Sequence, residues 1–197
     1  LELLCKGQPA RMSETKGDDE ARVFAQAQLL TAKPVLYVCN VAEEDAANGN
    51  ALSQQVFAKA KAEGAQAVVV SAAIESEIVA MEAGERAEYL AELGLAESGL
   101  ARVIRAGYQL LGLNTFFTVG PKEARAWTFH RGARAPQAAG EIHTDFERGF
   151  IRAETIAYAD YVALGGEAGA REAGKLRQEG KEYLVQDGDV MLFKFNV

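Results

Sequence analysis

The stretch VLYVCNVAE at residues 35–43 decides the fold of the first part of this chain. Its first five residues are a continuous apolar run, rich in β-branched and aromatic residues, bounded by Pro34 and Asn40. Such a run predicts a short strand buried on both faces, as in a parallel sheet. AVVVS at 67–71 predicts a second buried strand, and the apolar residues between the two runs repeat at helical spacing up to Gly64. The segment therefore predicts a right-handed βαβ unit.

Helices are expected on both sides of this unit. Residues 1–6 read as the end of a helix, and a second helix is predicted over about 18–30, before Pro34 ends it. Downstream, IESEIVAM and GERAEYLAELG have helical spacing, and a longer helix is expected from Ser98, whose hydroxyl can cap it, to Gly112.

From about Asn114 the hydrophobic period shortens, which predicts a second domain. TFFTV and ARAWTFHRG read as strands joined by a turn at Gly120-Pro121. EIHTDFERGF suggests a helix with Ile142 and Phe146 packed inward, IRAETIAY a further strand, and DGDVMLFKF a last strand after an Asp-Gly turn. Two strands, a helix and then more strands are typical of a β-grasp.

Composition excludes several classes of protein. The chain has 197 residues, of which 49% are apolar and 25% charged, as in ordinary globular proteins. Cys5 and Cys39 stand in no metal-binding or disulfide pattern, and neither His130 nor His143 has ligand or nucleophile spacing, so no metal site is predicted. No run of about 18 apolar residues and no signal peptide occurs, so we expect a cytoplasmic protein without a membrane partner.

Charge is unevenly distributed along the sequence. The net charge of −7 argues against a protein that coats DNA, because phosphate binding needs an excess of Lys and Arg. Residues 121–152, however, carry six bases against four acids. Their basic residues, interleaved with aromatic ones, are candidates for an RNA-facing strip, although such alternation is also that of a sheet with one solvated face. The candidates are Lys122, Arg125, Arg131 and Arg134, with Trp127 and Phe129 between them.

The first predicted strand ends in Asn40-Val41-Ala42-Glu43, where a ligand site is expected. Residues at the carboxyl edge of parallel strands face the crevice in which α/β sheets bind ligands. Taken alone, the four residues favour a turn followed by the solvated start of a helix. They resemble, however, the NKxD base-recognition motif of P-loop GTPases in its NxxE variant, which is characteristic of the YchF subfamily of Obg-like ATPases.

The resemblance to this family spans nearly the whole chain. SAAIESE at 71–77 resembles the next base-contacting loop, and three long stretches are similar to the family's C-terminal half: LNTFFTVGPKEARAWTFHRG, APQAAGEIHTDFERGFIRAE and VQDGDVMLFKFNV. The resemblance implies the C-terminal part of a Rossmann-like P-loop NTPase domain with associated helices, followed by a ubiquitin-like β-grasp (TGS) domain. The implied segments are the end of a helical insertion at 1–32, the nucleotide-binding domain at 33–111 and the TGS domain at 112–197.

The NxxE variant alters how the site would read a base. In the usual motif an aspartate accepts two hydrogen bonds from guanine, while the lysine stem packs along the ring. Val41 and the longer Glu43 displace that clamp, whereas the amide of Asn40 can still bond to a purine. The resemblance therefore implies binding of ATP in preference to GTP, with Asn40, Val41 and Glu43 on one side of the base and Ser71 and Ala72 on the other.

The parts that perform hydrolysis are not found in this sequence. No GxxxxGK[ST] motif occurs, so the phosphate cradle and the hydroxyl that holds magnesium are missing. We expect the chain to be a fragment, with the catalytic residues upstream of Leu1, of an ATPase that binds ATP and Mg²⁺ when intact. Neither ligand is expected to bind tightly to this chain alone.

Partners and rival functions follow from the same resemblance. TGS domains accompany ribosome-associated proteins, so the ribosome or RNA is an expected partner through residues 112–197. One alternative is a TGS-based module that binds RNA, ribosomes or proteins without a catalytic role. A complete enzyme of another type would need a catalytic constellation that the sequence does not contain.

Overall fold

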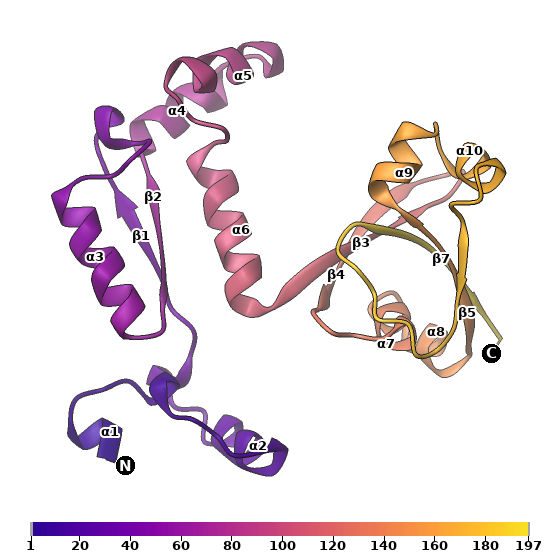
Figure 1. Ribbon diagram of the computed structural model, residues 1–197, viewed down its shortest axis with the longest axis horizontal. Helices are drawn as coiled ribbons and strands as arrows, with labels where there is room; N and C mark the ends of the chain where they lie inside the picture. The colour runs from indigo at the N-terminus through magenta and orange to yellow at the C-terminus, as the bar shows by residue number, and fades with distance from the viewer. Residues whose placement is uncertain (1, 197) are drawn as a thin grey trace. The chain divides into compact units, whose positions relative to one another are not determined.

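The computed structural model describes residues 2–196 and divides into two compact units, with the boundary between Leu111 and Gly112 (Figure 1). Leu1, expected in the first helix, lies outside the described residues. The first unit opens with short elements: α1 (Glu2–Cys5), a 3₁₀ turn (Ala10–Met12), α2 (Asp18–Gln26) and a second 3₁₀ turn (Leu30–Ala32). The prediction of a helix over 18–30 is therefore wrong at its end. Gln28 has a φ of +47°, a left-handed conformation that α-helices do not continue through.

The βαβ unit predicted from the sequence is present. Strand β1 (Leu36–Asn40) is followed by a 3₁₀ turn (Glu43–Asp45), helix α3 (Ala51–Ala62) and strand β2 (Gln66–Val70). The two strands pair in parallel, with Leu36 opposite Gln66 and Asn40 opposite Val70. The Asn50 side chain caps α3 by accepting bonds from the Leu52 and Ser53 amides. Gly64, with a φ of +64°, follows the helix end as predicted.

Strand β1 is less buried than predicted. Val38, at its centre, is 50% exposed, and none of its five residues is fully buried. Within residues 2–196, β1 and β2 form a sheet of only two strands, so one edge of β1 has no neighbouring strand. A side chain in such a strand is shielded on fewer sides than one in the centre of a parallel sheet.

Three helices complete the first unit: α4 (Ala72–Ala80), α5 (Ala83–Glu92) and α6 (Gly99–Leu111). They correspond to the three predicted helical stretches, and the Ser98 hydroxyl caps α6 by accepting from the Ala101 amide at 3.1 Å. The turn that follows β1 packs against α4 through a small core of Ala46, Ile74, Ile78 and Leu95. This packing fixes the segment that carries Glu43 beside the start of α4.

The second unit is a five-stranded sheet in the order β4-β3-β7-β5-β6. The strands are β3 (Leu113–Val119), β4 (Ala124–His130), β5 (Phe150–Ala157), β6 (Arg177–Glu179) and β7 (Asp189–Phe195). Strands β3 and β7 pair in parallel, and the other neighbours are antiparallel. Four short helices accompany the sheet: α7 (Ala135–Gly140), α8 (Thr144–Arg148), α9 (Tyr158–Ala163) and α10 (Glu167–Glu172). This is the β-grasp arrangement predicted from the sequence.

An aromatic cluster forms the core of the second unit. Phe116 is fully buried at the centre, with ring centroids 5.8 Å from Phe129 and 5.6 Å from Phe193. Ile142 and Phe146 pack against this cluster, as predicted, although α8 begins only at Thr144. The core joins residues from the first and last strands of the unit, so the sheet closes around contacts between distant parts of the sequence.

Candidate functional site

Asn40 lies at the carboxyl end of β1, beside the start of α4. Its side-chain Oδ1 accepts a hydrogen bond from the Ala72 amide at 3.0 Å, although 32 residues separate the two in sequence. This bond occupies one lone pair of the amide oxygen and orients the group. Within residues 2–196 the amide nitrogen donates no hydrogen bond, so both of its hydrogens remain for an acceptor such as a purine ring nitrogen.

Ser71 contributes a buried hydroxyl at the same edge. It precedes α4 directly and is 2% exposed. Its Oγ has no hydrogen-bond partner within the described residues. A buried polar atom without a partner is uncommon, and a ligand or an ordered water commonly satisfies such a group. The structure thus brings Asn40, Ser71 and Ala72 together at one edge, while their contact with a base stays a prediction.

Val41 and Glu43 follow the strand in different environments. The Val41 amide donates to the Val70 carbonyl at 2.9 Å, so its N–H is already used and a main-chain contact with a base is left to its carbonyl. Glu43 is exposed at the start of the 3₁₀ turn. A hydrogen bond to Glu77, then burial, and then the charges of Glu77 and Glu43 raise the pKa of Tyr89 to about 12.

Glu75 is a structural residue of this edge that the sequence analysis did not single out. Its two carboxylate oxygens accept bonds from the Gly99 amide at 2.6 Å and the Leu100 amide at 3.2 Å. A carboxylate at a helix N-terminus satisfies free N–H groups and complements the helix dipole. Glu75 therefore ties α6 to α4. Its place in SAAIESE was visible in the sequence, but its partners lie 24 and 25 residues further along.

The four basic candidates of the second unit do not share one end of the hairpin. Lys122 and Arg125 lie near the β3–β4 turn, whereas Arg131 and Arg134 follow the other end of β4, about 20 Å away at 3.3 Å per residue. Arg125 stacks over the Trp127 indole at 4.1 Å, and Arg134 pairs with Glu182 at 2.7 Å. Phe129 is buried in the core, so it adds nothing to an exposed aromatic strip. A role for these four residues in binding RNA stays a prediction.

No cluster of metal-binding side chains is found among the described residues. Within residues 2–196, no cluster of three or more His, Cys, Asp or Glu side chains is arranged to hold a metal ion. His143 instead caps α8 by accepting a bond from the Asp145 amide at 3.2 Å. Among the described helices, none has the length and apolar character needed to cross a membrane.

Comparisons with known proteins agree with this architecture. Residues 113–196 match the family YchF-GTPase_C, described as a protein of unknown function (DUF933). The chain is 54% identical over 191 residues to the ribosome-binding ATPase YchF of Bacillus subtilis, covering 96% of this chain and 52% of that protein. It is 42% identical over 191 residues to the Obg-like ATPase 1 of Rattus norvegicus, covering 95% and 48%.

A solved structure gives the same result for the fold. The Schizosaccharomyces pombe YchF GTPase matches with a TM-score of 0.81 at 34% identity, over 98% of this chain and 51% of that chain. The chain thus spans about half the length of the curated relatives it matches. By sequence and by fold, it belongs to the family of YchF-type, Obg-like ATPases and corresponds to a C-terminal portion of such a protein.

Proposed function

We propose that this chain supplies the base-reading edge of a ribosome-associated ATPase, together with a TGS module. The observation that carries the proposal is the junction of β1 and α4, where the Asn40 side chain accepts a hydrogen bond from the N–H of Ala72, and the preceding residue, Ser71, has a buried hydroxyl with no partner within residues 2–196. A convergent set of polar groups at the carboxyl edge of parallel strands is where α/β folds bind ligands. The relatives named above are described as ribosome-binding or Obg-like ATPases.

In this proposal the chain's own residues recognise adenine and leave the phosphates to another part of the protein. The Asn40 amide nitrogen donates to a purine ring nitrogen, Val41 contacts the base, and Ser71 and Ala72 line its other side. Within residues 2–196, no three His, Cys, Asp or Glu side chains are arranged to hold a metal ion. In this proposal ATP and Mg²⁺ are cofactors of the intact protein, in which a phosphate-binding loop would hold the triphosphate and the metal ion would neutralise its charge.

Base preference is the first property to test. In the intact protein, Val41→Lys combined with Glu43→Asp should shift preference from ATP toward GTP, because the pair restores two carboxylate acceptors for guanine and a lysine stem along the ring. A gained or lost recognition of this kind changes affinity by about 1–3 kcal/mol. Competition binding between the two nucleotides measures the change, with Glu44→Asp as the matched control. Unchanged ATP preference in the double variant would remove Glu43 from the base site.

The chain of 197 residues should bind ATP only weakly by itself. Two base hydrogen bonds of about 1 kcal/mol each do not offset the several kcal/mol of translational and rotational freedom lost on binding. We therefore expect no resolvable change in melting temperature with millimolar Mg-ATP. Saturating binding at a hundred times the dissociation constant would add about 2.7 kcal/mol. A clear ATP-specific rise in melting temperature would place a complete nucleotide site within this chain.

Ribosome association would be carried by the TGS module at residues 112–197, which is a compact unit with its own aromatic core. A cytoplasmic location follows from such a partner. Co-sedimentation of residues 112–197 with ribosomes would favour a binding module that acts independently of the nucleotide site. If the intact protein co-sediments with ribosomes and residues 112–197 do not, the association depends on the ATPase domain.

A further inference from the structure

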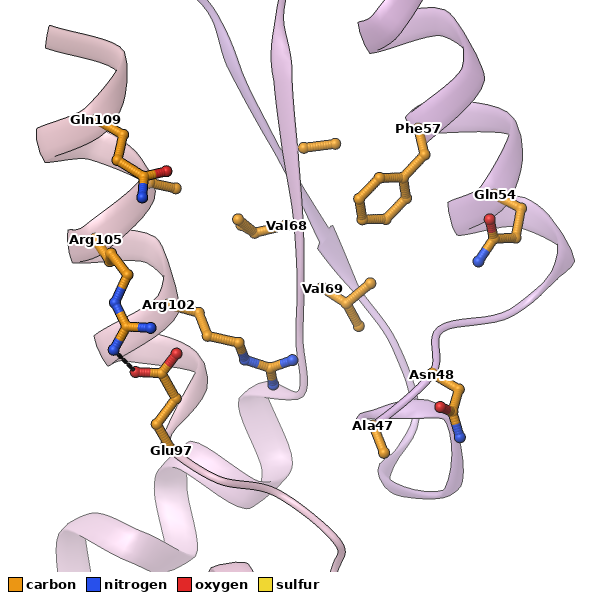
Figure 2. Close-up of a pocket in the computed structure, with 12 residues that line it drawn as sticks. Ala47, Asn48, Gln54, Phe57, Val68, Val69, Glu97, Arg102, Arg105 and Gln109 are labelled. Carbon is orange, nitrogen blue, oxygen red and sulfur yellow. Dashed lines mark hydrogen bonds and ion pairs between the residues drawn. The ribbon is translucent and has the colours of Figure 1, made fainter. Parts of the chain in front are cut away.

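A groove of about 550 Å³ runs beside β2, between α3 and α6 (Figure 2). Strand residues 67–69 line it, with Phe57 on the α3 side and Arg102 and Arg105 on the α6 side. Figure 2 shows Val68 turned toward α6 and Val69 on the other side of the strand. The groove contains none of the proposed base-contacting residues, so it is a separate feature of the first unit.

The edge of β2 along this groove has free backbone groups. Gln66 donates its amide to the Val35 carbonyl at 3.1 Å, and the Val70 carbonyl accepts from Val41 at 2.9 Å. In a parallel ladder, alternate residues direct both backbone groups to the same neighbour. Ala67 and Val69 therefore direct theirs away from β1, toward the groove. Within residues 2–196, β2 pairs with no strand other than β1, so the groups on this edge have no strand partner among those residues.

The wall formed by α6 is positively charged, against the negative charge of the whole chain. Arg105 pairs with Glu97 at 2.5 Å, whereas Arg102 donates one weak bond, at 3.3 Å, to the Ala46 carbonyl. The Nε of Arg102 is buried and has no hydrogen-bond partner within the described residues. The guanidinium groups of Arg102 and Arg105 are thus balanced by only one carboxylate of the groove, that of Glu97. A ligand in the groove that brings a carboxylate would balance this charge.

We propose that this groove binds an extended peptide of a partner protein, which adds to β2 as a third strand and places an acidic side chain against Arg102. Strand addition uses main-chain hydrogen bonds for affinity and pockets for alternate side chains for specificity. Successive side chains of the added strand face opposite walls. An acidic residue directed to α6 would thus have apolar neighbours directed to Phe57 on α3. The preferred segment is an acidic residue between two apolar ones.

The test begins with a displayed library of random heptapeptides selected on the intact protein. We expect enrichment of sequences with Asp or Glu between apolar residues, and the best of them is then synthesised for anisotropy titrations. Ala67→Pro removes an N–H that faces the groove and leaves the pairing with β1 intact, since proline is tolerated on edge strands. It should weaken peptide binding at least tenfold, whereas the matched variant Ala67→Ser, which keeps the N–H, should bind normally.

The charge contact is tested by a double-variant cycle. Arg102→Gln should weaken binding of the acidic peptide at least tenfold and leave binding of the same peptide with Gln in place of its acid unchanged. Failure of the library to enrich any peptide would overturn the proposal, as would equal binding by Ala67→Pro. If the wild-type protein is a dimer and Ala67→Pro is a monomer, the edge binds a second copy of the protein and the proposal is wrong. The proposal would also be contradicted if an oligonucleotide bound more tightly than the selected peptide and lost affinity on Arg102→Gln.

Discussion

Replacing Asp189 with alanine should destabilise the second unit by about 2–3 kcal/mol, because it leaves buried donors without their acceptor. Asp189 is 3% exposed at the start of β7. Its Oδ2 accepts bonds from the Tyr183 hydroxyl at 2.7 Å and the Gln186 amide at 2.9 Å, and its Oδ1 accepts from Arg177 at 3.3 Å. Alanine leaves the Tyr183 hydroxyl and the Gln186 amide without this acceptor, whereas Arg177 keeps the Tyr183 hydroxyl and Glu179 as partners.

The Asp189 network joins the segment before β7 to β6, which is the edge of the sheet. Burial, followed by the hydrogen bond to Asp189, raises the pKa of Tyr183 above its usual value, so the phenol remains a neutral donor. Loss of the carboxylate therefore removes contacts both from the segment that precedes β7 and from β6. The effect should exceed that of Tyr183→Phe, which removes one donor and costs about 1 kcal/mol.

Urea denaturation followed by tryptophan fluorescence measures this loss directly, because the single tryptophan of the chain, Trp127, lies in β4 of the same unit. Its signal reports the second unit even if the first unfolds separately. Asp189→Asn keeps one acceptor oxygen. Its loss of unfolding free energy should therefore lie between those of Tyr183→Phe and Asp189→Ala. A loss below about 1 kcal/mol for Asp189→Ala would mean that water replaces the carboxylate, contrary to its burial.

Much of the fold could be predicted because its main elements have strong local signals. The apolar runs that became β1 and β2, the Gly64 cap and the β3–β4 hairpin at Gly120-Pro121 are each specified by neighbouring residues. Helices α7, α9 and α10 were not predicted, since each has only six residues and no full pattern of helical spacing. Strand β6, with three residues, is too short to show alternation.

The sequence predicted that Asn40 and Ser71 would lie at one edge of the sheet, but it did not predict their contacts. Parallel strands bring their carboxyl ends together, so Asn40 and Ser71 could be expected at one edge from the sequence. The bond from the Ala72 amide to Asn40, and the bonds from the start of α6 to Glu75, depend on how the helices pack. Burial of the Ser71 hydroxyl without a partner likewise arises from tertiary structure. Such contacts join distant residues and leave no periodic trace in the sequence.

Asn40→Asp separates the structural role of this side chain from its proposed role in binding. The carboxylate can still accept the bond from the Ala72 amide, so α4 should keep its place. It has no N–H to donate, and it would set a negative charge against the purine nitrogen. An unsatisfied polar contact in a binding site costs about 1–3 kcal/mol, and each 1.4 kcal/mol is a tenfold change in affinity.

The affinity of the intact protein for ATP, compared between wild type and Asn40→Asp, tests the base-reading assignment most directly. We expect ATP to bind about ten- to a hundredfold more weakly to the variant, while inorganic tripolyphosphate, which has no base, binds both proteins equally. Gln8→Glu, which makes the same chemical change at an exposed residue outside the site, should leave both affinities unaltered. Equal affinity of wild type and Asn40→Asp for ATP would contradict the account.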